Sequence, residues 1–284
     1  MRDIANEFLK LPKRPQNSHK GTFGKILNIA GSKKYSGAAI LSSLSALKAG
    51  AGYVTLACHE NIISSVSSYT PDITFLPLKI ATNNFSCEEN VKTILDKIGS
   101  YNVLSVGCGL TTEKFVSEFV MKILQNMKIP AVIDADALNI IAVNDNVKFD
   151  FPSVITPHPK ELSGLLKTDI EEILKDREKY CQKAALKYNT ICVLKGQNTV
   201  ISDGVNLYVN FTGNSALAKA GSGDVLTGLI AGFAAQGCPM FQAAVLGVHI
   251  HGLCGELAGE DLTEYSVLAS DLLTYIPQAI KKLM

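Results

Sequence analysis

Short runs of apolar and β-branched residues recur along the whole chain, and most are followed by glycine or proline and then by a helical segment. Within each run the apolar residues are continuous and do not alternate with polar ones. Continuous runs are typical of strands buried on both faces, as in a mostly parallel sheet covered by helices. We therefore expect strands at residues 26–30, 53–57, 73–76, 103–106, 131–133, 154–156, 191–194, 199–202 and 207–209.

Cap-type residues and prolines mark the starts of the expected helices. The predicted starts are Ser36-Gly37, the region near Thr112, Pro159, Asp169, Ser222 and Pro239. The charged, amphipathic stretch 169–189 is typical of one solvated outer helix. Asp203-Gly204 lies between the last two short strands and predicts a hairpin, so that an antiparallel ribbon joins the edge of the sheet.

These elements predict an α/β fold with three layers, in which a mostly parallel central sheet carries helices on both faces. No Pro/Ser-rich linker, low-complexity tract or fixed-period repeat interrupts the chain. One domain over residues 1–284 is therefore the simplest organisation.

Charge and hydrophobicity narrow the expected partners. The 27 Lys and Arg residues nearly balance the 26 Asp and Glu residues, which gives a net charge of +1. Because no strong positive field results, we expect a small-molecule substrate and no binding to nucleic acid or to acidic membranes. The first residues are charged, and the apolar segments 225–235 and 243–250 are shorter than the ~18–20 residues of a membrane span.

The cysteines are scattered singly and show no C-x-x-C spacing, so we expect buried thiols in a reducing, cytoplasmic compartment. They are Cys58, Cys87, Cys108, Cys181, Cys192, Cys238 and Cys254. Cys108 has no partner base nearby in sequence, which favours a buried thiol over a nucleophile. His249 and His251 are two residues apart in an apolar helical segment, so they make a poor metal pair.

The turn Gly221-Ser222-Gly223-Asp224 opens a segment, 225–235, that is almost wholly apolar. Backbone amides at a helix start bind phosphate oxygens and stabilise the charge that builds up in phosphoryl transfer. Asp224 is then placed to accept a proton from an attacking hydroxyl. An ordinary glycine loop with Asp224 as a cap is the alternative, but the polar segment 210–219 favours a ligand-lining loop. The turn therefore predicts transfer of a nucleotide's phosphoryl group to a small molecule's hydroxyl.

Further candidates follow the carboxyl ends of predicted strands, where open α/β sheets gather their ligands. His158 lies between two prolines in Thr156-Pro157-His158-Pro159-Lys160-Glu161, which strengthens its claim on a ligand. Glu161 is a candidate for orienting metal-bound water, and compensation of the helix dipole is the alternative. Lys195-Gly196 suits contact with a nucleotide, and a solvated turn is the alternative.

Two other pairs of residues keep two interpretations each. Asp134 and Asp136 either hold Mg²⁺ through water or divide into a helix cap and a carboxylate that faces the cleft. Gly31-Ser32 and Gly37-Ala38 either let a ligand approach the backbone or allow tight packing of helix on sheet.

Taken together, these segments resemble the ribokinase-like superfamily and, within it, the ADP/ATP-dependent NAD(P)H-hydrate dehydratase family. The resemblance runs from about His19 to the last helix and leaves residues 1–18 as an N-terminal extension. The order of T-P-H-P-x-E, T-G-N and G-S-G-D is its most specific part. The matching segments are His19-Lys20-Gly21, Gly31-Ser32, Tyr35-Ser36-Gly37-Ala38, Gly50-Ala51-Gly52, Gly107-Cys108-Gly109-Leu110, Asp134-Ala135-Asp136-Ala137-Leu138, Thr156-Pro157-His158-Pro159-Lys160-Glu161, Leu194-Lys195-Gly196, Thr212-Gly213-Asn214 and Gly221-Ser222-Gly223-Asp224-Val225-Leu226.

The resemblance implies a ribokinase-like fold and, as substrate, the S form of NADH or NADPH hydrated on its nicotinamide ring. In the family's chemistry ADP or ATP phosphorylates the ring hydroxyl, and phosphate then leaves so that the working cofactor is restored. Mg²⁺ would bridge the nucleotide phosphates. The family also implies a homotetramer. Both nucleotides and both hydrated cofactors stay open as substrates.

Carried over residue by residue, the resemblance makes Asp224 the base and places the anion hole at the amides around Gly221, Ser222 and Gly223. The expected contacts with the hydrated cofactor are Ala38, Gly109, His158 and Asp224. The expected nucleotide contacts are Lys195, Gly196, Gln197, Asn198, Thr199 and Gly223.

The chain departs from the family's pattern at three points. Cys108 stands where the family usually has proline, and Lys219-Ala220 replaces the more common threonine-glycine. Residues 1–18 are too few for the epimerase domain that is often fused to this one. We therefore expect a free-standing dehydratase whose epimerase is a separate protein.

Two rival functions fit part of the pattern. A vitamin kinase of the same superfamily, acting on hydroxymethylpyrimidine, hydroxyethylthiazole or pyridoxal, would share the anion hole. Such kinases resemble one another in having asparagine near the position where this chain has His158. A non-catalytic nucleotide sensor would keep the glycine loop without needing Asp224.

Overall fold

The nine predicted strands are all present and form one sheet in the computed structural model, which describes residues 8–80, 84–144 and 147–284. Their order across the sheet is β3-β2-β1-β4-β5-β6-β7-β8-β9. The strands are β1 (Lys25–Ile29), β2 (Tyr53–His59), β3 (Thr74–Leu78), β4 (Val103–Val106), β5 (Ala131–Ile133), β6 (Ser153–Ile155), β7 (Ile191–Leu194), β8 (Val200–Ser202) and β9 (Leu207–Val209).

Seven of these strands, β1 to β7, pair in parallel, and β8 and β9 add the antiparallel ribbon that Asp203-Gly204 predicts. The strand order reverses direction between β1 and β4, so the connections that follow these two strands leave toward opposite sides of the sheet. In open α/β sheets this switch point is where ligand crevices form.

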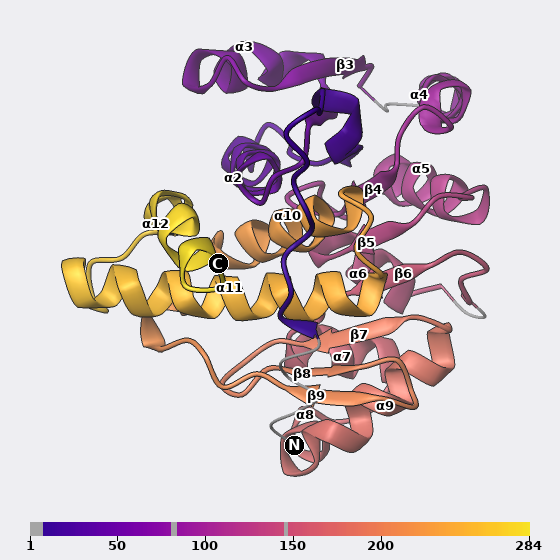
Figure 1. Ribbon diagram of the computed structural model, residues 1–284. Coiled ribbons are helices and arrows are strands. Elements are labelled where there is room, and N and C mark those ends of the chain that lie inside the picture. The colour runs from indigo at the N-terminus through magenta and orange to yellow at the C-terminus, as the bar shows by residue number, and fades with distance from the viewer. Residues whose placement is uncertain (1–7, 81–83, 145–146) are drawn as a thin grey trace.

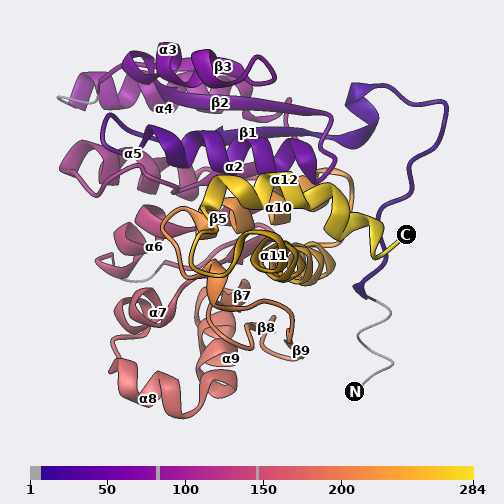
Figure 2. The same ribbon diagram turned by 90° about the vertical axis from the view of Figure 1, so that its left-hand side faces the viewer.

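Helices cover both faces of the sheet, as predicted (Figures 1 and 2). One layer holds α2 (Ser36–Lys48), α3 (Glu60–Tyr69), α10 (Ser222–Ala235), α11 (Met240–Leu262) and α12 (Ala269–Lys281). The other holds α4 (Asn84–Ile98), α5 (Lys114–Gln125), α6 (Ala135–Ala142), α7 (Pro159–Leu166), α8 (Ile170–Lys175) and α9 (Arg177–Tyr188). Two 3₁₀ turns are η1 (Lys20–Phe23) and η2 (Ser215–Leu217).

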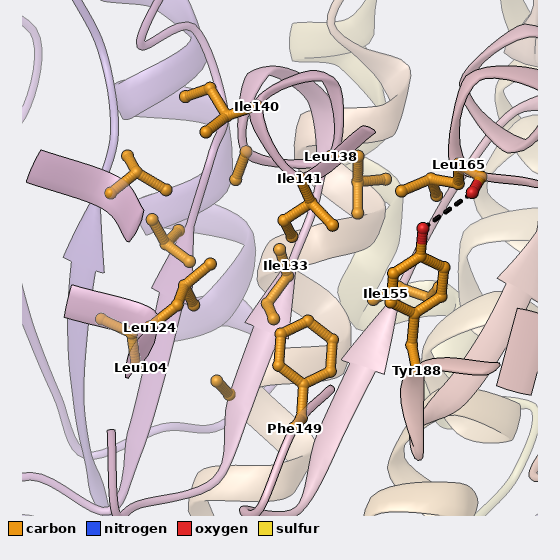
Figure 3. Packing of buried hydrophobic residues seen from close by; sticks show 14 of the residues in the cluster. Leu104, Leu124, Ile133, Leu138, Ile140, Ile141, Phe149, Ile155, Leu165 and Tyr188 are labelled. Atoms are coloured by element: carbon orange, nitrogen blue, oxygen red, sulfur yellow. Dashed lines mark hydrogen bonds between the residues drawn. The ribbon is translucent and has the colours of Figure 1, made fainter. Parts of the chain in front are cut away.

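Alternate strand residues supply the two cores because successive side chains of a strand point to opposite faces. Ile26 packs under α10 and α11, whereas Leu27 packs in the cluster beneath α4 to α9. Figure 3 shows part of this second cluster, where Ile133 and Ile155 of neighbouring strands meet buried side chains of α6 and α7. The hydroxyl of Tyr188 is the polar atom in this region, and it donates to the carbonyl of Leu165 at 2.8 Å.

Three sequence expectations about helices were wrong or incomplete. The stretch 169–189 forms two helices, α8 and α9, because Asp176 breaks the first and caps the second by accepting from the amide of Lys179 at 3.1 Å. This stretch also buries one side of α9 against the sheet. The helix expected near Thr112 begins at Lys114, and α3 and α4 were not singled out.

Other expectations concern burial. Six of the seven cysteines are buried and Cys238 is half-buried, which agrees with the expectation of free apolar thiols. No helix in the described parts of the chain is long and apolar enough to cross a membrane. Part of the expected N-terminal extension, residues 1–7, lies outside the described residues.

A close contact between α2 and α10 fixes where the Gly221-Ser222-Gly223-Asp224 turn lies. A Cβ on Gly228 would lie 1.9 Å from Ser45 Oγ and 2.2 Å from the carbonyl oxygen of Ser42. A Cβ on Gly232 would lie 2.6 Å from the carbonyl oxygen of Ala46. The two helices therefore approach backbone to backbone, and only glycine fits on the α10 side.

We predict that Gly228→Ala destabilises the protein by about 1–3 kcal/mol through overpacking. The sign of this change in stability is informative, because replacing glycine by alanine inside a helix otherwise stabilises the protein by up to about 1 kcal/mol. Urea unfolding measures the change. Gly99→Ala is the control, since no atom lies within 4 Å of the position of its Cβ. Equal stability changes in the two variants would contradict the close contact.

Candidate active site

A cavity of about 650 Å³ lies beside the start of α10, at the carboxyl ends of β6 and β7, and we name it the α10 cavity. All six residues expected to bind the nucleotide line it. Its wall includes His158, residues 195–199, residues 210–215 and Ser222-Gly223. Its volume is in the range of about 300–1,000 Å³ that is usual for small-molecule sites.

The first turn of α10 presents free backbone amides. Gly221 has φ +92°, and a Cβ there would lie 2.7 Å from Leu41 Cδ1, so glycine is needed for the turn. The amide of Ser222 donates to the carbonyl of Lys219 at 3.2 Å. Within the described residues the amides of Gly223 and Asp224 have no backbone acceptor. Among these residues the amide of Gly221 has none either, so two of the three amides expected around Gly221 to Gly223 are free to bind an anion.

Asp224 has the properties of a general base. Burial, and next the negative charge of Asp134, raise its pKa from 3.8 to about 6, although Cys108 and Lys195 act in the opposite direction. A carboxyl group with this pKa is ionised at neutral pH and is more basic than an ordinary aspartate. The position of Asp224 in the first turn agrees with the sequence prediction.

A buried ion pair joins the loops around this base. Lys195 Nζ lies 2.7 Å from Asp134 Oδ1 and 3.6 Å from Glu161 Oε2. Thr227 of α10 donates to Asp134 Oδ2 at 2.7 Å. Burial disfavours both charges, but Lys195 holds the pKa of Asp134 below its usual value, and the two carboxylates raise the pKa of Lys195. The ammonium group of Lys195 is thus committed to protein carboxylates at the wall of the α10 cavity.

Asp134 precedes α6, yet its side chain makes no cap hydrogen bond. Its carboxylate is instead held by Lys195 and Thr227. Asp136 accepts from the amide of Thr111 at 2.7 Å. Both carboxylates therefore have protein donors, and neither acts as the helix cap that the sequence left open.

The loop that carries His158 is rigid. His158 Nδ1 accepts from the amide of Glu161 at 3.1 Å, while Glu161 Oε2 accepts from the amide of His158 at 2.7 Å. This reciprocal capping box, followed by Pro159, fixes the start of α7. The side chain of His158 is 48% exposed and faces the α10 cavity. Burial raises the pKa of Glu161, against the influence of Lys195.

The two small residues expected to contact the hydrated cofactor lie against each other. Gly109 has φ +65°, and a Cβ there would lie 2.8 Å from Ala38 Cβ and 3.0 Å from the carbonyl oxygen of Tyr35. Neighbouring Cys108 is 1% exposed, and burial followed by the charge of Asp224 raises the pKa of its thiol. This thiol is therefore not a nucleophile, which agrees with the sequence interpretation.

Sequence reasoning missed three residues that support the site, and one of them is Arg177. Its guanidinium donates to the carbonyls of Leu194 at 3.0 Å and Lys195 at 3.3 Å, and also to the carbonyl of Gln197. It therefore holds the loop 195–199 from the first turn of α9. Its acceptors are backbone atoms, so no pairing of side-chain types in the sequence could indicate it.

The other two are Thr227 and His251. His251 is buried, and its Nε2 lies 2.9 Å from the carbonyl oxygen and 3.0 Å from Oγ of Ser222. A carbonyl only accepts, so Nε2 carries the proton; burial lowers the pKa of this ring to about 4 and keeps it neutral. His251 thus orients Ser222 at the start of α10 and is no metal ligand here.

We predict that Lys195→Met lowers the free energy of unfolding by about 3–5 kcal/mol, because Asp134 would remain buried without its charged partner. Adding Asp134→Asn should recover part of the loss, since the buried charge is then removed. Urea unfolding of the single and double variants tests this. Lys175→Met breaks an exposed ion pair with Glu172 and should cost less than about 1 kcal/mol. If Lys195→Met lowered the free energy of unfolding no more than Lys175→Met does, the buried ion pair would not stabilise the fold.

Comparison with known proteins identifies the family to which the chain belongs. A family model described as NAD(P)H-hydrate dehydratase matches residues 26–278. The ADP-dependent (S)-NAD(P)H-hydrate dehydratase of Bacillus subtilis is 33% identical over 274 residues, which are 96% of this chain and 94% of that protein. The bifunctional NAD(P)H-hydrate repair enzyme of Moorella thermoacetica is 37% identical over 278 residues, 96% of this chain but 52% of that protein. The chain thus spans about half the length of the bifunctional relatives.

Solved structures of related proteins have the same fold. The crystal structure of a Bacillus subtilis ADP/ATP-dependent NAD(P)H-hydrate dehydratase, co-crystallized with ATP/Mg²⁺, has a TM-score of 0.87 and 31% identity, covering 100% of this chain and 98% of that one. The ribokinase-like fold is therefore confirmed. A pyridoxal kinase from Staphylococcus aureus, with a TM-score of 0.55 and 15% identity, shares the fold alone. On the family model and these relatives together, the chain belongs to the NAD(P)H-hydrate dehydratase family.

Proposed function

We propose that this protein restores NADH or NADPH from the S form of the hydrated cofactor, using ADP or ATP to phosphorylate the ring hydroxyl. The observation that carries the proposal is the pairing of Asp224, a half-buried carboxyl group with a raised pKa, with the free amides at the start of α10. Family membership supports the choice of substrate. The same membership disfavours a vitamin kinase, to which the chain is related by fold alone.

In this reaction Asp224 accepts the proton of the ring hydroxyl as its oxygen bonds to the terminal phosphorus, and ADP or AMP leaves. The amides of Gly223 and Asp224 stabilise the negative charge on the transferring group. The lone pair of the ring nitrogen then expels phosphate, and loss of a proton from the neighbouring ring carbon restores the double bond. Ala38, Gly109 and His158 would contact the hydrated ring. Gly223 and residues 195–199, namely Lys195, Gly196, Gln197, Asn198 and Thr199, would hold the nucleotide.

Magnesium fits this site as a companion of the nucleotide. In the described parts of the chain no three His, Cys, Asp or Glu side chains are grouped to hold a metal ion. A Mg²⁺ ion that keeps phosphate and water ligands needs only one or two carboxylates. Glu161, 3.6 Å from Lys195 Nζ, is the carboxylate we propose for orienting a metal-bound water. The ion would neutralise charge on the phosphates.

The setting of the enzyme is also a proposal. The names of the bifunctional relatives support a functional link with a second repair activity, which we propose is the epimerase. We further propose a homotetramer in the cytoplasm, on the resemblance to the family and the expectation of reduced thiols.

We expect purified protein with hydrated NADH, Mg²⁺ and either ADP or ATP to restore absorbance at the dihydronicotinamide maximum. Comparing the rates with ADP and ATP, and with hydrated NADH and hydrated NADPH, then shows which nucleotide and which hydrated cofactor the enzyme prefers. A sample without nucleotide is the control. No recovery with either nucleotide, together with phosphorylation of hydroxymethylpyrimidine or pyridoxal, would overturn the dehydratase in favour of a vitamin kinase.

We expect kcat/KM to rise with pH up to the pKa of Asp224, about 6, and to level off above it, because the base must be ionised. Asp224→Asn should lower kcat by roughly 10²–10⁴-fold and leave nucleotide binding, measured by calorimetry, largely unchanged. An active Asn variant would exclude Asp224 as the base.

The same variant, Asp224→Asn, should lose activity but gain folding stability. The folded protein binds the Asp224 proton more tightly than the unfolded chain does, so ionisation above its pKa destabilises the fold. Asp224→Asn should therefore raise the free energy of unfolding at pH of about 8 by up to about 3 kcal/mol. The gain should shrink as the pH is lowered through about 6 and vanish below about 4, where the unfolded chain becomes protonated as well.

A further inference from the structure

A second cavity, of about 380 Å³, lies at the carboxyl ends of β1, β2 and β3, and we name it the β1–β3 cavity. Its wall comes from the ends of β1, β2 and β3, whereas the wall of the α10 cavity comes from the start of α10 and the loops after β6 and β7. Figure 1 shows β3 toward one end of the sheet and β7 toward the other. The two cavities share no lining residue. No step of the proposed reaction uses the β1–β3 cavity.

This cavity adjoins the residues expected to hold the hydrated ring. Its wall includes Gly31 and Leu110, and the amide of Gly31 donates to the carbonyl of Cys108 at 2.8 Å. Leu110 directly follows Gly109, which packs on Ala38. The β1–β3 cavity therefore lies next to the segment that is expected to hold the hydrated ring.

Two buried polar atoms of its wall have no hydrogen-bond partner among the described residues: Ser32 Oγ and His59 Nε2. His59 Nδ1 accepts from the amide of Asn61 at 3.0 Å, and burial lowers the pKa of the ring. The neutral ring then carries its proton on Nε2, which is a donor without an acceptor. An unpaired buried donor costs about 1–3 kcal/mol, so a ligand that supplies the acceptor removes this cost.

The cavity is apolar inside and positively charged at its rim. Ala57, Leu78 and Phe119 contribute apolar surface. Lys33 and Lys34 are exposed at the rim and form no ion pair within the described part of the chain, whereas Lys79 is paired with Glu89 at 2.9 Å. A flat base with polar edges and phosphates attached has the complementary chemistry.

We propose that the β1–β3 cavity binds the adenosine half of the hydrated dinucleotide, with Lys33 and Lys34 against its phosphates and Ser32 and His59 donating to its polar edge. The inference rests on the proposed function. The nucleotide co-substrate occupies the α10 cavity, so the second half of the dinucleotide needs a different site. The distance from the reacting hydroxyl makes this a site for binding energy and specificity.

The test compares two substrates: hydrated NADH, and the hydrate of reduced nicotinamide mononucleotide, which lacks the adenosine half. In Lys33→Ala/Lys34→Ala we expect kcat/KM for hydrated NADH to fall about tenfold. In His59→Asn, which keeps a cap for α3 but has no donor at the position of Nε2, we expect a fall of about fivefold. The truncated substrate keeps one phosphate, so we expect its kcat/KM to fall less than that of hydrated NADH in Lys33→Ala/Lys34→Ala and to stay unchanged in His59→Asn.

The control is Lys281→Ala/Lys282→Ala, which removes the same charge from an exposed pair at the end of α12. Equal losses on both substrates, or no loss on hydrated NADH, would overturn the inference while the dehydratase activity stands. Binding of NAD⁺ and of nicotinamide mononucleotide, measured by calorimetry with ADP saturating the α10 cavity, should show the same contrast. If neither hydrate is turned over, the proposed function fails, and a loss of NAD⁺ affinity confined to these variants still identifies the adenosine site.

Discussion

The buried ion pair between Lys195 and Asp134 is the interaction on which the site depends. Asp134 is 1% exposed, and an ionised carboxylate at that depth requires charged or hydrogen-bonded partners. Lys195 comes from the end of β7 and Thr227 from α10, so satisfying one carboxylate brings two distant segments together. The order β5-β6-β7 makes this possible, because neighbouring parallel strands end at the same edge of the sheet.

This pair also divides the acid–base roles of the carboxylates. Lys195 keeps Asp134 charged, and that fixed negative charge, after burial, raises the pKa of Asp224 to about 6. The pKa values of these two neighbouring aspartates are thus driven apart, which is the usual sign of different functions. Asp134 is structural because both its oxygens have donors. Asp224 keeps the basicity that proton abstraction requires, and the fold is less stable for it.

Much of this arrangement could be predicted from the sequence, because some signals are local. Continuous apolar runs identified the nine strands, and Asp203-Gly204 identified the hairpin. Gly221 is required by a positive φ that is itself a local property. The site residues Asp224 and His158 lie beside such signals, at a helix start and between prolines.

What could not be predicted depends on contacts between distant residues. Thr227 and Asp134 are 93 residues apart. From its local sequence, Thr227 is an ordinary helix residue and Asp134 an ordinary helix cap. Arg177 binds backbone carbonyls, which every residue has, and the solvated-helix pattern of 169–189 concealed its role. His251 was judged only as a metal ligand, although the proton on Nε2 serves a carbonyl.

The loop after β4 explains how one small fold can bring two large ligands together. Gly107 has φ +130°, and a Cβ there would lie 1.8 Å from the carbonyl oxygen of Asp134, while a Cβ on Gly109 would lie 2.8 Å from Ala38 Cβ. The loop follows β4, where the strand order reverses, and its Cys108 lies against Asp224 on the side of α10. Leu110, at its other end, reaches the β1–β3 cavity. The loop therefore contacts the segment around Asp224 at one end and the β1–β3 cavity at the other, and a side chain at either glycine would collide with Asp134 or Ala38.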